Sequence, residues 1–118
     1  MQLSFLQTPT QKITVVQSED IVFHTAEDAA ELLINCRYND SECIIIYEHN
    51  LPPAFFNLKT KLAGDILQKF STYQGRLAIV GDFSKYESKS LKDFIYESNK
   101  QGRINFVSTI EEAEKALS

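Results

Sequence analysis

The sequence has few of the residues that mark reactive or metal-binding proteins. Its 118 residues include no Trp, two Cys, two His, three Pro and four Gly. Cys36 and Cys43 form no CxxC pattern and have no His at metal-ligand spacing, so we expect two reduced thiols near the core and no metal site. No G-x-S-x-G nucleophile motif and no Walker pattern is present, and we expect no cofactor.

A basic surface and a long apolar run are also absent. Lys and Arg number 12 against 16 Asp and Glu, and the resulting formal charge of −4 argues against nucleic acid as a partner. The longest apolar run, at 43–47, is far shorter than the about 20 residues that a membrane span needs. Residues 1–7 lack the basic and apolar regions of a signal peptide, so we expect a cytoplasmic protein without a transmembrane segment.

What remains is the composition of one globular domain. Hydrophobic residues make up 43% and charged residues 24% of the chain, both near the globular average. The chain contains no repeat, no low-complexity tract and no Gly/Ser linker that would divide it. We therefore expect a single domain over residues 1–118.

Apolar periodicity predicts five strands and four helices. The strands are expected at 2–7, 13–16, 43–47, 77–80 and 104–107. The helices are expected at about 25–37, 58–73, 88–100 and 110–117. Thr25 with Asp28 and Ser108 with Glu111 are typical of capping boxes, and Gly75 offers a left-handed cap after the second helix.

The order of these elements is β-β-α-β-α-β-α-β-α. From residue 43 onward strands and helices alternate, which predicts parallel pairing of the last three strands through right-handed crossovers. The first two strands can pair antiparallel at an edge. The expected fold class is α/β, with a mixed five-stranded sheet and four helices.

Several motifs in the central and C-terminal parts of the chain point to a known family. They are Glu48-His-Asn-Leu51, Phe55-Phe56-Asn-Leu-Lys-Thr60, Ala63-Gly64-Asp-Ile-Leu-Gln-Lys-Phe70, Leu77-Ala-Ile-Val-Gly-Asp-Phe-Ser84 and Ser88-Lys-Ser-Leu-Lys-Asp-Phe-Ile-Tyr-Glu-Ser-Asn99. With these motifs the chain closely resembles a bacterial domain-of-unknown-function family, DUF4180, over nearly its whole length. That family has no established activity that the resemblance could imply for this chain.

A second resemblance concerns the C-terminal part. The segments 76–82, 104–107 and 111–117 look like the end of SpoIIAA-like proteins of the STAS type, which implies a STAS-like fold. STAS anti-sigma antagonists carry a phosphorylatable Ser at the helix after the third strand. The corresponding loop 50–60 has no such Ser motif, which argues against partner switching by phosphorylation. Its only hydroxyl residue, Thr60, is expected to be a helix N-cap.

Polar residues follow two of the buried strands. Glu48, His49 and Asn50 come after the strand at 43–47, whereas Asp82 and Ser84 come after 77–80. Open α/β sheets bind ligands outside the carboxyl ends of their parallel strands. If the strands are neighbours, His49 could approach Asp82 or Glu48, and a carboxylate would orient its ring for proton transfer. The alternative is a polar loop whose side chains cap Lys59 or nearby backbone groups.

Residues 81–90 and two phenylalanines each allow two interpretations. Lys85 and Lys89 near a helix N-terminus could form an anion site, although a capped turn fits better because the Walker spacing is missing. Phe55 and Phe56 either form an exposed apolar patch for a protein or lipid contact, or fold back onto the core as a lid. The candidate N-caps for the turn are Ser84, Ser88 and Ser90.

Three hypotheses of function follow. The leading one is a non-catalytic binding or regulatory module, whose unknown protein partner or small apolar ligand contacts the loop 48–60 and the strand end 82–84. The second is a small enzyme using Glu48, His49 and Asp82 for acid-base chemistry, and the third is a homodimer formed through the edge strand 2–7. The candidate ligand-binding residues are Glu48, His49, Asn50, Phe55, Phe56, Lys59, Asp82 and Ser84.

Overall fold

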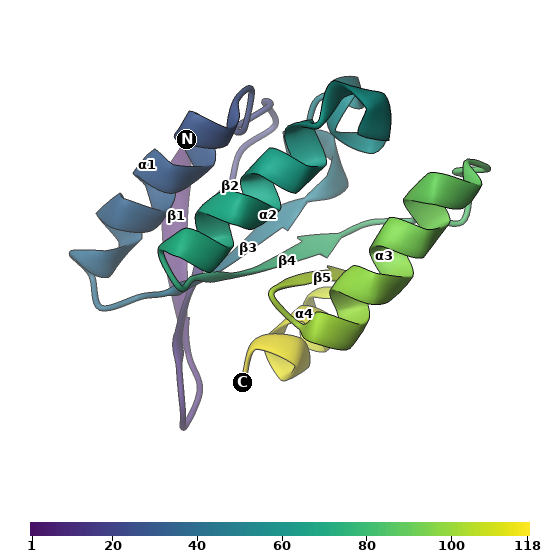
Figure 1. Cartoon of the computed structure of the whole chain (residues 1–118). Helices are drawn as coiled ribbons and strands as arrows, with labels where there is room; N and C mark the ends of the chain where they lie inside the picture. Colours follow the sequence, from purple (N-terminus) through teal and green to yellow (C-terminus); the bar gives the residue numbers. More distant parts are fainter.

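Five strands form one sheet in the order β1-β2-β3-β4-β5, and the computed structural model describes all residues from 1 to 118 (Figure 1). β1 pairs antiparallel with β2, and β2 through β5 pair parallel. The expected mixed sheet is confirmed, and its parallel part extends one strand further than the last three. The strands are β1 (Gln2–Gln7), β2 (Lys12–Gln17), β3 (Cys43–Tyr47), β4 (Arg76–Val80) and β5 (Ile104–Val107).

Four helices cover the two faces of the sheet unequally. The helices α1, α2 and α3 cover one face, and α4 lies on the other (Figure 1). Side chains of the first three join one large apolar cluster, and those of α4 join a smaller one. No helix combines the length and apolar character that crossing a membrane requires. The helices are α1 (Ala26–Arg37), α2 (Leu62–Thr72), α3 (Lys89–Gln101) and α4 (Ile110–Leu117).

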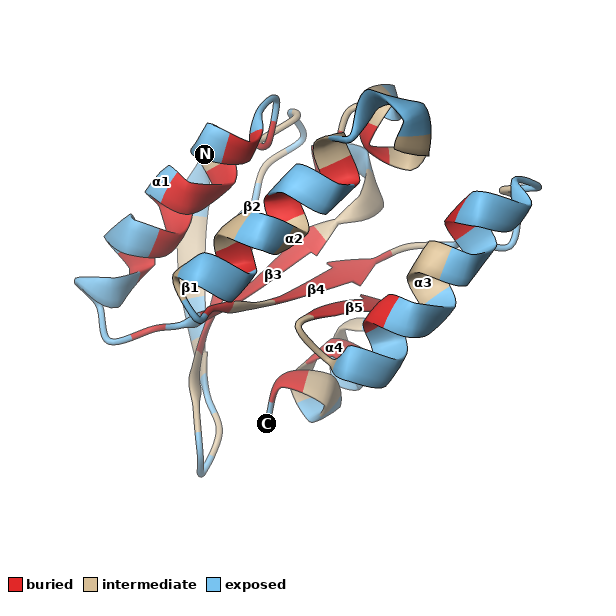
Figure 2. Ribbon diagram, in the orientation of Figure 1, coloured by how far each residue is buried: buried red, intermediate tan, exposed pale blue.

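The central strand β3 shows why its run of isoleucines is needed. Ile44 and Ile46 face the helices α1 and α2, whereas Ile45 faces α4, and all three are fully buried. A strand covered on both faces has no solvent side, so it is apolar at every position instead of at every second one. Figure 2 shows this burial continuing through β4 and β5.

The two cysteines lie on opposite faces of the sheet. Cys36 belongs to the large cluster and Cys43 to the small one, and both are free and buried. Burial raises the pKa of both thiols, because the surroundings disfavour the charged thiolate. The expectation of two thiols packed near the core is confirmed.

Helix starts agree with the sequence in one case and differ in another. Thr25 caps α1 as expected, since its side chain accepts from the Asp28 N–H while Asp28 accepts from the Thr25 N–H. The expected helix at 58–73 is wrong at its start, because Leu58–Thr60 forms a 3-10 turn and Lys61 then takes a left-handed backbone with φ 67°. Lys61, not Thr60, is therefore the N-cap of α2.

The last helix starts one residue later than its expected capping box. Thr109, not Ser108, is the N-cap, and its side chain accepts from the Glu112 N–H at 3.1 Å. A Glu stands three residues after both hydroxyl residues, so the pattern alone fits either start. With the helix beginning at Ile110, Ala113 and Leu117 face the sheet and are fully buried.

Gly75 makes room for a neighbouring helix and does not supply a left-handed cap. The left-handed residue after α2 is Gln74, with φ 56°. A Cβ atom added at Gly75 would lie 2.5 Å from Leu33 Cδ2 of α1, which is closer than real contacts allow. Gly75 is therefore needed for the close approach of the chain to α1.

The two edges of the sheet differ. Phe106 of β5 donates its N–H to Asn99 Oδ1 of α3 at 2.7 Å, and Asn99 Nδ2 donates to the Phe106 carbonyl at 3.3 Å. The carboxamide of Asn99 thus pairs with Phe106 as a neighbouring strand would. β1 forms the other edge, and its pairing with a second copy stays a prediction.

We predict opposite effects for alanine at two glycines. Gly75→Ala should lower the free energy of unfolding by about 1–3 kcal/mol, because the new methyl group overpacks Leu33. Gly64→Ala should raise it by about 0.5–1 kcal/mol, because Gly64 lies in α2 with open space around it. Urea unfolding measures both, and equal effects would contradict the packing role of Gly75.

Candidate functional site

A pocket of about 520 Å³ opens where β3 and β4 end. One side comes from the 3-10 turns Glu48–Asn50 and Pro53–Phe56, which follow β3, and the other from the loop after β4. Its position agrees with the rule that parallel sheets bind ligands beyond their carboxyl ends. The lining residues are Tyr47, Glu48, His49, Leu51, Pro53, Phe56, Val80, Gly81, Lys85 and Tyr86.

Asn50 holds the first turn in place. Its fully buried side chain accepts the Tyr47 N–H at 2.8 Å and donates to the carbonyls of Ser18 and Asp20 at 2.9 and 2.8 Å. These bonds join the end of β3 to the loop after β2. Since every polar atom of the amide is used, Asn50 shapes the site from beneath and does not line the pocket.

Glu48 is the centre of a polar cluster in the pocket. Its Oε2 atom accepts from Tyr86 Oη at 2.6 Å and contacts Lys85 Nζ at 2.7 Å. Its Oε1 atom lies 3.4 Å from the Asp82 N–H. A Cβ atom added at Gly81 would lie 2.7 Å from Glu48 Cβ, so only glycine leaves room for this position.

These contacts shift the acidities within the cluster. Burial raises the pKa of Glu48, but the hydrogen bonds from Lys85 and Tyr86 and the charge of Lys85 together lower it below its ordinary value. Burial and the hydrogen bond to the Glu48 carboxylate raise the pKa of Tyr86. At neutral pH Glu48 is therefore a carboxylate and Tyr86 a neutral phenol.

Aromatic side chains form the walls. The ring of Tyr86 stacks on Phe56 with centroids 4.7 Å apart and planes at 11°, and Tyr47 stacks on His49 at 5.7 Å. Phe55 is fully buried and packs edge-on against Phe56. Of the two interpretations for this pair, the lid over the core describes Phe55, whereas Phe56 is half-buried and lines the pocket.

Of the three proposed acid-base residues, His49 makes no hydrogen bond or ion pair with the other two. His49 is exposed, its Nε2 atom lies 2.9 Å from the Ser18 carbonyl, and no ion pair joins it to a carboxylate. Asp82 accepts from the backbone and hydroxyl of Ser84 at 3.0 and 2.6 Å, and these bonds lower its pKa. The structure thus contains no hydrogen bond or ion pair between His49 and Glu48 or Asp82, and the acid-base role of the three residues stays a prediction.

The remaining expected site residues lie outside the pocket. Lys59 is exposed on the 3-10 turn Leu58–Thr60, and Ser84 is engaged with Asp82. For residues 81–90 the capped turn is confirmed, because the Ser88 side chain accepts from the Leu91 N–H at the start of α3. Lys89 pairs with Asp93 and does not join Lys85 in an anion site.

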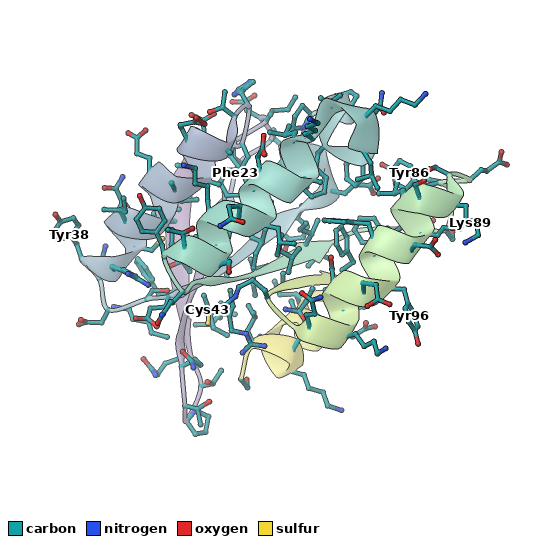
Figure 3. The ribbon with its side chains drawn as sticks, in the orientation of Figure 1. Phe23, Tyr38, Cys43, Tyr86, Lys89 and Tyr96 are labelled. Carbon is teal, nitrogen blue, oxygen red and sulfur yellow. The ribbon has the colours of Figure 1, made fainter.

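Tyr47, Gly81 and Tyr86 were not expected at the site from the sequence, and neither was the contact between Lys85 and Glu48. One signal for Lys85 and Tyr86 was present, since both lie in the loop directly after the buried strand at 77–80, which ends at Gly81. Figure 3 shows Tyr86 beside the start of α3, and Tyr96 farther along that helix on its outer side.

The family model for a domain of unknown function, DUF4180, matches residues 8–117. The chain belongs to the DUF4180 family. No curated protein and no solved structure matches it, so the resemblance to STAS domains stays a prediction. The match includes every residue that lines the pocket, so the site lies within the DUF4180 domain itself.

We predict that the low pKa of Glu48 depends on its two partners. Tyr86→Phe and Lys85→Met should each raise it, because each removes a hydrogen bond to the carboxylate. Lys89→Met is the matched control and should leave it unchanged, since Lys89 pairs with Asp93. Carboxyl carbon NMR across pH 2–7 measures the pKa, and an ordinary value in the unmodified chain would contradict the cluster.

The same shift has a consequence for stability. The pKa of Glu48 is lower in the folded state than in the unfolded chain, so its ionisation stabilises the fold. This stabilisation is present above the unfolded pKa of about 4.3 and is lost as the pH falls through the folded pKa. The difference in unfolding free energy between the unmodified chain and Lys85→Met should therefore shrink below about pH 4. A difference that stays constant down to pH 2 would contradict this.

Proposed function

We propose that the chain is a non-catalytic binding module that holds a small, partly aromatic ligand in the pocket beyond β3 and β4. The observation that carries the proposal is the make-up of this pocket: aromatic and aliphatic walls surround one ion-paired carboxylate. Its volume of about 520 Å³ lies within the range of about 300–1,000 Å³ that is usual for small-molecule sites.

The walls supply the contact area that such a ligand needs. Phe56, Leu51 and Val80 give an apolar surface, and Tyr86 adds an aromatic ring held in place by its stacking on Phe56 and its bond to Glu48. Because the ring is already oriented, a ligand loses little free energy in ordering it. A planar or aromatic ligand group fits this surface best.

The hydrogen bonds favour binding over acid-base catalysis. A general base works best with a pKa near the operating pH, yet the contacts of Glu48 with Lys85 and Tyr86 lower the pKa of its carboxyl group below the ordinary value. His49 is directed at a backbone carbonyl and not at a carboxylate. These contacts favour the binding module over the alternative of a small enzyme using Glu48, His49 and Asp82.

The proposal is tested with para-cresol, a small neutral phenol, added to the full chain and followed by amide NMR. We expect shifts at the residues after β3 and β4, with a dissociation constant in the millimolar range because the probe is small. Phe56→Ala should weaken binding about three- to tenfold, since aromatic contacts contribute about 0.5–1.5 kcal/mol beyond area burial.

The matched control is Tyr96→Ala, which removes an exposed aromatic ring from the outer side of α3. Its affinity for para-cresol should equal that of the unmodified chain. Phe55→Ala is unsuitable as a probe of binding, because Phe55 is fully buried and its loss would destabilise the fold. Shifts elsewhere on the surface, or full binding by Phe56→Ala, would overturn the proposed function.

A further inference from the structure

The two charged groups of the pocket, the Glu48 carboxylate and the Lys85 ammonium group, differ in how far their surroundings restrict them. The Glu48 side chain is 18% exposed, accepts a hydrogen bond from the Tyr86 hydroxyl and lies against the backbone of Gly81. The Lys85 side chain is 57% exposed and lies on the loop between β4 and α3. The carboxylate is therefore a fixed charge, whereas the ammonium group sits on a flexible stem that can leave at little cost.

The position of the Lys85 ammonium group is itself informative. Its Nζ atom lies 2.7 Å from Glu48 Oε2 and 5.5 Å from the centre of the Tyr86 ring. A position that contacts a carboxylate and also lies over an aromatic ring suits an organic cation, which gains a charge-assisted hydrogen bond and a cation–π contact there. In this structure a side chain of the chain itself fills that environment.

We propose that the pocket binds a small amine, whose protonated amino group replaces the Lys85 ammonium group on Glu48. The apolar or aromatic body of the amine then lies against Phe56 and Tyr86. This inference rests on the proposed binding function and adds the chemical class of the ligand.

The opposite charge fits the pocket poorly. An anion would have to draw Lys85 away from Glu48 and would then lie near a fixed carboxylate, which repels it. An amine is attracted by the same carboxylate. When Lys85 moves into water, the amine takes its place as the partner of Glu48. The fixed negative charge therefore selects a cation.

Lys85 acts in this arrangement as an internal competitor. While its ammonium group is on Glu48, an amine cannot bind there, so the apparent affinity is reduced by the fraction of time that Lys85 is bound. Removing the charge of Lys85 should thus strengthen the binding of an amine. For an anionic ligand held by Lys85 the same change should weaken binding. The direction of the change in affinity therefore distinguishes an amine from an anion as the ligand.

The test uses three compounds that share a phenol ring and differ in charge: tyramine as the cation, para-cresol as the neutral compound and 4-hydroxyphenylacetate as the anion. In amide NMR titrations at pH 7, tyramine should bind most tightly to the full chain. In Lys85→Met its affinity should rise about two- to fivefold, and fivefold corresponds to about 1 kcal/mol. Glu48→Gln, which keeps the shape of the side chain, should reduce tyramine to the affinity of para-cresol.

Lys89→Met is the matched control, because it removes a lysine paired with Asp93 outside the pocket, and tyramine should bind it unchanged. The proposal is overturned if 4-hydroxyphenylacetate binds best, or if Lys85→Met fails to strengthen tyramine binding. When para-cresol binds and tyramine binds no better, only the choice of an amine fails. When none of the three compounds binds, the proposed function fails with it.

Discussion

The parallel pairing of β2, β3, β4 and β5, in the order in which they occur in the chain, determines most of this structure. Because each crossover leads to the next strand along, α1, α2 and α3 cover one face and the strands end at one edge. The strand order never reverses, so no crevice opens between diverging crossovers as it does in doubly wound sheets. The walls of the pocket come instead from the 3-10 turns after β3 and the loop after β4.

Much of the fold could be predicted because its signals are local. The isoleucines at 44–46 and the pair Thr25 and Asp28 each indicate their element without further context. The errors arise where several structures share one pattern. Residues 58–60 fit an α-helix as well as a 3-10 turn. Lys61, which has a left-handed backbone, separates this turn from α2, and a lysine does not indicate such a backbone. Gly75 was misread because glycine is used for space as well as for backbone angles.

The site was predictable in position but not in its contacts. Strand ends can be read from apolar runs, so Glu48 and His49 were correctly expected at the carboxyl edge of the sheet. Their partners depend on the tertiary structure, since Tyr86 is 38 residues from Glu48 along the chain. The expected pairing of the two strands suggested His49 as a partner of Glu48 or Asp82 instead. In a 3-10 turn neighbouring side chains point in different directions, and His49 turns toward Ser18.

The two hydrogen bonds between the Asn99 side chain and the Phe106 backbone limit how copies of this chain can associate. A sheet that can accept a new strand on both sides can grow without end, one copy after another, into a fibre. Here the side chain of Asn99 blocks the β5 side at Phe106, which leaves β1 as the side where another backbone can add. Two copies joined through β1 would have no further strand to offer, so growth by strand addition stops at two.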